Sequence, residues 1–224
     1  MLGWIICREG KPIPPERCVC EGVIFWRLYT PLPHRRRERR FLTSALREMY
    51  RRGVRRAVVE GDIEDEVMRA GILPVEVSVL RQALLPQLLT WVDREWQLDL
   101  RRSTVQITAR RADERVYRAA EEAGRAARYV RLAVGAGQRE LEEQLCRRLG
   151  LGGGGLPVLE VCLDGEACAG VPYLDVGRGC RGRQQVMLTT AGAENGKESL
   201  LCALYEAEKL PIEEIQVRFV EFRA

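Results

Sequence analysis

Short apolar runs alternate with amphipathic helical segments along this chain, and this alternation constrains its fold more than any other feature. Strands that alternate with helices of about ten to fifteen residues are typical of βαβ units, which build a largely parallel sheet. The runs are continuously apolar, as expected for strands that helices cover on both faces. The clearest runs are RAVVEG (56–61), TVQITA (104–109), YVRLAV (129–134) and PVLEVCLD (157–164).

The remaining segments extend the same pattern. Residues 8–21 contain three prolines and are predicted to form a loop, whereas 164–182 is predicted to be irregular. Pro86 either kinks the helix predicted over 78–98 or opens a second helix there. Further strands are predicted at 3–7, 22–29, 72–77, 185–190 and 215–222, and helices at 41–52, 64–71, 113–126, 138–149 and 197–208.

This order predicts a doubly wound, Rossmann-like α/β fold, with a mostly parallel sheet, helices on both faces and a single compact unit. The pattern pauses near 98–103, which makes that stretch the best candidate boundary. We therefore expect an N-terminal α/β lobe over 1–100 and a C-terminal lobe over 101–224, within one continuous domain.

The overall composition excludes some functions and leaves others open. The chain carries 36 basic and 32 acidic residues, and its net charge of +4 does not by itself indicate nucleic acid. No apolar run approaches the 18 or so residues that cross a bilayer, and the N-terminus lacks the basic start of a signal peptide, so we expect a cytoplasmic protein without a membrane partner. Eight cysteines without C-x-x-C pairs, together with a single histidine, His34, argue against a metal site. The trio Cys162, Cys168 and Cys180 is the one arrangement worth checking.

The stretch VMLTTAGAENGKESLLCAL, residues 186–204, invites comparison with a phosphate-binding loop. Such a loop needs G-x-x-x-x-G-K-[ST], but Ala191 stands at the first glycine and Glu198 at the hydroxyl position. A carboxylate beside the phosphates would repel them. We therefore predict a plain turn at 193–196, a helix after it and no binding of nucleoside triphosphate through Lys197.

A better candidate anion site lies where two neighbouring strands end. Gly135 and Gly137 follow one strand and precede a helix, which gives part of the G-x-G-x-x-G pattern that brings backbone amides close to a phosphate. Thr108, Arg110 and Arg111 follow the preceding strand, where ligands of open parallel sheets bind. The alternatives are a plain strand-to-helix turn and an arginine-rich loop in which Asp113 caps the next helix.

Arginines are densest between residues 35 and 56, where they outnumber the acidic residues. Because the aromatic residues of a single-strand platform are missing there, a solvated helix face is the favoured interpretation, with at most weak, salt-sensitive nucleic-acid binding. No catalytic residue or cofactor is indicated, although the long segment 164–182 is a candidate lid. The leading hypothesis is an α/β protein that binds an anionic small molecule or nucleotide at the strand ends. The alternative is a non-catalytic regulatory or interaction protein with a decayed ligand site, and nucleic-acid binding ranks last.

Overall fold

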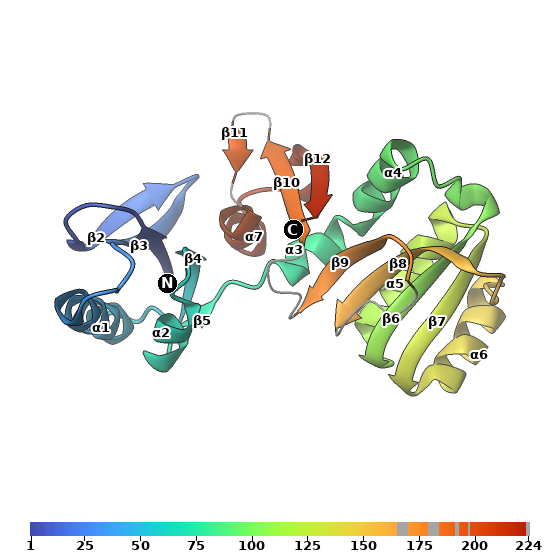
Figure 1. The fold of residues 1–224 in the computed structure, drawn as a ribbon, viewed down its shortest axis with the longest axis horizontal. Coiled ribbons are helices and arrows are strands. Elements are labelled where there is room, and N and C mark those ends of the chain that lie inside the picture. The colour runs from blue at the N-terminus through green and yellow to red at the C-terminus, as the bar shows by residue number, and fades with distance from the viewer. Residues whose placement is uncertain (165–169, 179–183, 191–192, 197, 223–224) are drawn as a thin grey trace. The chain divides into compact units, whose positions relative to one another are not determined.

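The computed structural model describes most of the chain, as two compact units. The first unit comprises Met1–Val77 and Lys197–Pro211, and the second comprises Ser78–Gly196 and Ile212–Ala224. Figure 1 labels their elements. The lobes 1–100 and 101–224 stay a prediction. The described residues are 1–164, 170–178, 184–190, 193–196 and 198–222.

A five-stranded sheet in the order β2-β3-β1-β4-β5 forms the centre of the first unit. Its four strands other than β2 run parallel, whereas β2 pairs with β3 in the antiparallel sense. The loop predicted over 8–21 was therefore wrong: Pro14 and Pro15 lie in an edge strand, where a missing N–H is tolerated. The strands are β1 (Leu2–Cys7), β2 (Ile13–Cys20), β3 (Val23–Thr30), β4 (Arg56–Glu60) and β5 (Leu73–Pro74).

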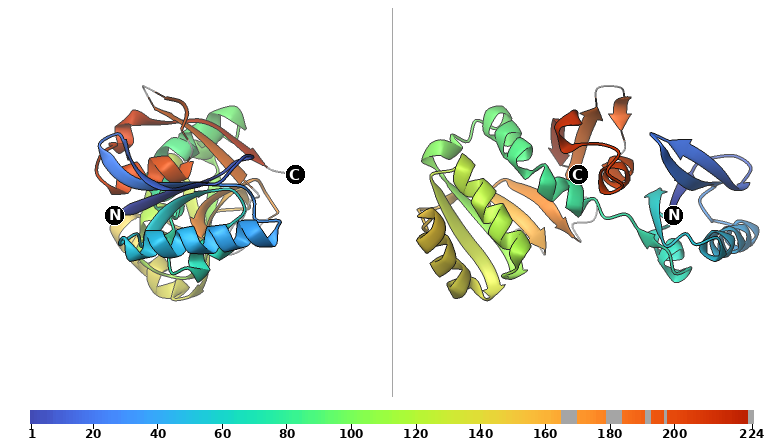
Figure 2. Two further views of the ribbon diagram at one scale, coloured as in Figure 1. Left: turned by 90° about the vertical axis from the view of Figure 1, so that its left-hand side faces the viewer. Right: turned by 180° about the vertical axis from the view of Figure 1, so that it is seen from behind.

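Helices cover both faces of this sheet. The buried stripe of α1 includes Leu42, Leu46 and Met49, and it packs in one core cluster with Ile5 and Leu28 of the sheet. On β4, Arg56 points to the other helix layer and pairs with Glu206 of α7 at 2.8 Å. Figure 2 shows α1 lying along one side of the strands. The helices of the first unit are α1 (Arg36–Arg51), α2 (Glu64–Arg69) and α7 (Glu198–Glu206).

The second unit is built around a four-stranded parallel sheet in the order β7-β6-β8-β9. A three-stranded antiparallel sheet, β11-β10-β12, belongs to the same unit. The strands are β6 (Thr104–Arg111), β7 (Tyr129–Ala136), β8 (Pro157–Asp164), β9 (Tyr173–Arg178), β10 (Gln184–Thr190), β11 (Ala193–Gly196) and β12 (Ile215–Phe222). The helices are α3 (Ser78–Ala83), α4 (Leu85–Glu95), α5 (Glu114–Ala126) and α6 (Gln138–Leu149), with 3-10 turns at Leu100–Arg102 and Ile212–Glu214.

The α/β class with mostly parallel sheets and flanking helices is confirmed. Pro86 opens α4, which settles the alternative left open for 78–98. Two local predictions were wrong: β9 lies inside the segment predicted to be irregular, and the turn predicted at 193–196 is β11, paired with β10. None of the described helices combines the length and the apolar character needed to cross a bilayer.

Candidate functional site

The two turns predicted to form an anion site do lie side by side. Strands β6 and β7 are parallel neighbours, with Thr104 opposite Tyr129 and Arg111 opposite Ala136. Gly135 is required there by the strands themselves, because a Cβ at this position would lie 2.2 Å from the backbone oxygen of Arg110. The missing side chain thus allows close approach of two protein backbones, which is a structural role independent of any ligand.

Gly137 is required by its backbone conformation. It is the N-cap of α6 and has φ 82° and ψ 12°, in the left-handed region that favours glycine. Its carbonyl accepts a hydrogen bond from the N–H of Leu141 at 3.2 Å. As a glycine, this N-cap residue has no side chain that could cap the first turn of α6. The G-x-G spacing is therefore explained by strand packing at the first glycine and by helix geometry at the second.

The three residues predicted on the neighbouring strand are Thr108, Arg110 and Arg111, and they differ in their surroundings. The Thr108 side chain is buried within the sheet, and its hydroxyl donates a hydrogen bond to the carboxylate of Glu160 on β8. The backbone N–H of Arg110 donates to Asp164 Oδ1 at 2.5 Å. Both arginine side chains are exposed. The structure thus brings the backbones of the predicted site together, and it engages the Thr108 side chain within the sheet.

A hollow of about 470 Å³ opens beside Gly137, between the starts of α5 and α6. The carboxylates of Asp113, Glu114 and Glu140 line it together with Arg148. Asp113 and Glu114 also form ion pairs, with Arg115 and Arg118 respectively. The small-anion site at the strand ends stays a prediction. The lining residues are Ala112, Asp113, Glu114, Tyr117, Gly137, Glu140, Leu141, Gln144 and Arg148.

Asp113 is the N-cap of α5, as the sequence suggested. Its Oδ1 accepts hydrogen bonds from the N–H groups of Arg115, at 2.9 Å, and Val116, at 3.2 Å. Burial alone raises the pKa of this carboxyl. The hydrogen bonds from the Arg115 guanidinium and from the two backbone N–H groups outweigh burial, so the pKa of Asp113 lies below its usual 3.8.

Asp113→Ala is expected to lower the free energy of unfolding by about 1 kcal/mol at pH 7. Because the folded-state pKa is depressed, this stabilisation is complete above the unfolded pKa and is lost as the pH falls through the folded pKa. The difference between wild type and variant should therefore shrink below about pH 4. Urea denaturation at several pH values measures this difference in the free energy of unfolding. The control is Glu114→Ala at an exposed position, which is expected to change stability by less than about 0.5 kcal/mol. A difference that persists undiminished at acidic pH contradicts the capping role.

The strongest concentration of one charge lies on α1. An α-helix turns by about 100° per residue, so Arg36, Arg40, Arg47 and Arg51 fall within an arc of about 60°. Arg39 lies about 60° outside this arc. The side chains of all five arginines are exposed. We call Arg36, Arg39, Arg40, Arg47 and Arg51 the arginine face. The opposite side of α1 is the buried stripe described above, so this face points away from the core.

The arginine face differs from the other charged helices in its lack of neutralising partners. Within the described parts of the chain, none of its five guanidinium groups forms an ion pair with a carboxylate. The two glutamates of α1 are engaged elsewhere: Glu38 accepts from the N–H of Arg35, and Glu48 pairs with Arg52. Helices α5 and α6 instead carry the pairs Arg118–Glu114, Arg125–Glu121, Arg139–Glu143 and Arg147–Glu143.

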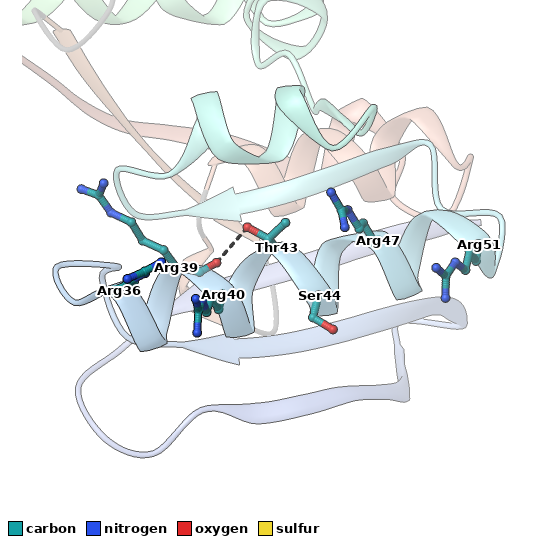
Figure 3. Close-up of a pocket in the computed structure, with 7 residues that line it drawn as sticks. All are labelled: Arg36, Arg39, Arg40, Thr43, Ser44, Arg47 and Arg51. Carbon is teal, nitrogen blue, oxygen red and sulfur yellow. Dashed lines mark hydrogen bonds between the residues drawn. The ribbon is translucent and has the colours of Figure 1, made fainter.

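A shallow hollow of about 440 Å³ lies on this face (Figure 3). Its middle is formed by the small side chains of Thr43 and Ser44, with arginines toward both ends of the helix. The Thr43 hydroxyl donates to the backbone oxygen of Arg39 at 2.8 Å. Ser44 lies one helical turn from both Arg40 and Arg47 along α1.

Some predictions fall outside the described residues. Cys168 and Cys180 of the cysteine trio lie there, as does Lys197. The candidate lid 164–182 is described only in part. Among the described residues, no group of three or more potential ligand side chains is placed to hold a metal ion.

Comparisons with known proteins add no family to this picture. No protein-family model matches the chain, and no curated protein matches it either. The candidate site therefore depends on the geometry and charge of the residues described above.

Proposed function

We propose that this α/β protein binds an anionic partner through the arginine face of α1. The observation that carries the proposal is the row of five exposed arginines without carboxylate partners among the described residues. Five like charges on one helix repel one another, and an anion that neutralises them removes that repulsion. Guanidinium groups suit phosphate and carboxylate oxygens because their donors form a planar fork.

This proposal keeps the predicted class of ligand and changes the location of its site. The strand-end turns have a carboxylate-lined hollow beside them, whereas the hollow on α1 has only arginine and hydroxyl side chains along it. A binding surface of this kind also fits a non-catalytic interaction protein. We further propose that the protein works in the cytoplasm. This location is supported by the six described cysteines, none of which forms a disulfide with another described residue.

The test is a calorimetric titration with inorganic polyphosphate at low salt. The double variant Arg40→Ala/Arg47→Ala removes the two arginines that flank Ser44, and we expect its affinity to fall at least tenfold, which corresponds to about 1.4 kcal/mol. The matched control is Arg139→Ala/Arg147→Ala on α6. It lowers the net charge of +4 by the same two units, but its arginines are already paired with Glu143 at 3.4 and 3.3 Å.

Two outcomes of this titration contradict the proposal. An equal loss of affinity in both double variants means that binding follows net charge and not the α1 surface. An unchanged affinity in Arg40→Ala/Arg47→Ala means that the anion binds elsewhere. Arg110→Ala, measured beside them, then decides whether the strand-end site is the one that binds.

A further inference from the structure

We infer that the anionic partner is double-stranded nucleic acid, held by the phosphates of its backbone without reading its sequence. This inference depends on the proposed function, since it names the partner of the same arginine face. Three features of that face carry it: its length, the chemistry of its side chains and the position of the apolar stripe of α1.

The length of the face suits a polymer with regularly spaced charges. With a rise of about 1.5 Å per residue, Arg36 and Arg51 are about 22 Å apart along the helix axis. A small anion at the centre could contact Arg40 and Arg47 but would leave the arginines at the two ends without a partner. A strand of duplex DNA carries one phosphate per about 3.4 Å of axis, so roughly six phosphate steps span the same length.

The side chains on the face fit backbone contacts and not base recognition. The hollow is lined by arginine, threonine and serine, and no aromatic or amide side chain is among its lining residues. Proteins that grip single strands stack bases on aromatic rings, and proteins that read duplex sequence commonly use asparagine or glutamine beside arginine. Helix α1 contains two aromatic residues, Phe41 and Tyr50. Phe41 packs against the core cluster, and Tyr50 is covered by the Arg55 guanidinium at 3.7 Å from the ring centroid.

The apolar residues of α1 are in the wrong place for a membrane surface. A helix that lies in a bilayer interface buries an apolar face among the lipids beside its basic face. Here Leu42, Leu46 and Met49 are at most 1% exposed and belong to the core of the first unit. The basic face itself offers only hydroxyls between its arginines. Phosphates of a duplex, which need only charge and hydrogen-bond donors, match it better.

The experiment is a fluorescence-polarisation titration of the full chain with a labelled random-sequence DNA duplex of about two helical turns, repeated over a series of salt concentrations. Each phosphate neutralised contributes about −0.9 to the slope of log affinity against log salt, so four or five arginines give a slope of about −4. Arg40→Ala/Arg47→Ala should reduce the steepness by about 2 and weaken binding at low salt at least tenfold. Arg139→Ala/Arg147→Ala should leave the slope within about 0.5 of wild type.

Other outcomes distinguish a failure of this inference from a failure of the proposed function. If polyphosphate binds through the α1 arginines but the duplex does not, the proposed function stands and this inference fails. Tighter binding of a single strand than of the duplex, or of phosphatidylserine vesicles at equal salt, also overturns the inference while leaving anion binding in place. If neither polyphosphate nor duplex binding responds to Arg40→Ala/Arg47→Ala, both fail.

Discussion

Gly135→Ala should destabilise the second unit by about 2–3 kcal/mol, because it forces a methyl group against a strand backbone. The added Cβ would lie 2.2 Å from the Arg110 carbonyl oxygen and 3.3 Å from its carbonyl carbon. A flexible side chain could turn away, but a backbone inside a parallel pair can move only by disturbing the hydrogen bonds between β6 and β7. In a chain of this size, the corresponding loss of melting temperature is roughly 5–10 °C.

Gly155→Ala is the matched control for Gly135→Ala. No atom lies within 4 Å of the Cβ that it would add, so its stability should stay within about 0.5 kcal/mol of wild type. Urea denaturation followed by circular dichroism compares the two variants. If Gly135→Ala unfolds at the wild-type urea concentration, the close approach of the two strands is wrong, and a ligand-related role for the glycine becomes the better explanation.

Leu46→Ala should destabilise the first unit by a comparable amount, about 3–4 kcal/mol. The Leu46 side chain is 1% exposed and lies in the core cluster between α1 and the sheet. Its removal takes buried methyl groups from the core and leaves a cavity that fully packed neighbours fill only in part. The arginine face depends on this packing, because the buried stripe of α1 is what directs the arginines outward.

Ser44→Ala tests the same helix from its exposed side. The residue lies in the hollow of the arginine face, and alanine has the higher helix propensity, so the free energy of unfolding should change by no more than about 0.5 kcal/mol. Comparable destabilisation by Ser44→Ala and Leu46→Ala in urea denaturation would mean that α1 is rotated from the orientation described here.

The parallel strands and their helices were predictable because each is long enough to show its period. The runs at β6, β7 and β8 are mostly apolar, and the stripe of α1 recurs at helical spacing. Elements at the sheet edges were harder to predict. The prolines of β2 indicate a loop, and only its place at the edge beside β3 permits a strand. The sequence of β9 carries no clear local signal for a strand. It forms a strand through its pairing with β8.

The candidate site was likewise predictable only in part. Sequence order placed Arg110 and Gly135 on neighbouring strands, and that adjacency is confirmed. Asp113 and Glu140 were visible in the sequence, but the single hollow that both residues line arises only from the tertiary structure. The arginines of α1 were visible in the sequence. What the sequence did not reveal is that the nearby Glu38 and Glu48 are occupied by other groups.

Chemical modification of arginine tests the central claim most directly. Phenylglyoxal reacts with exposed guanidinium groups, and mass spectrometry locates each modified residue. With saturating polyphosphate, we expect Arg40 and Arg47 to be protected, while Arg139 and Arg147 on α6 react as they do without it. Protection of the α6 arginines with continued reaction at Arg40 and Arg47 would contradict the account, because the anion would then bind away from α1.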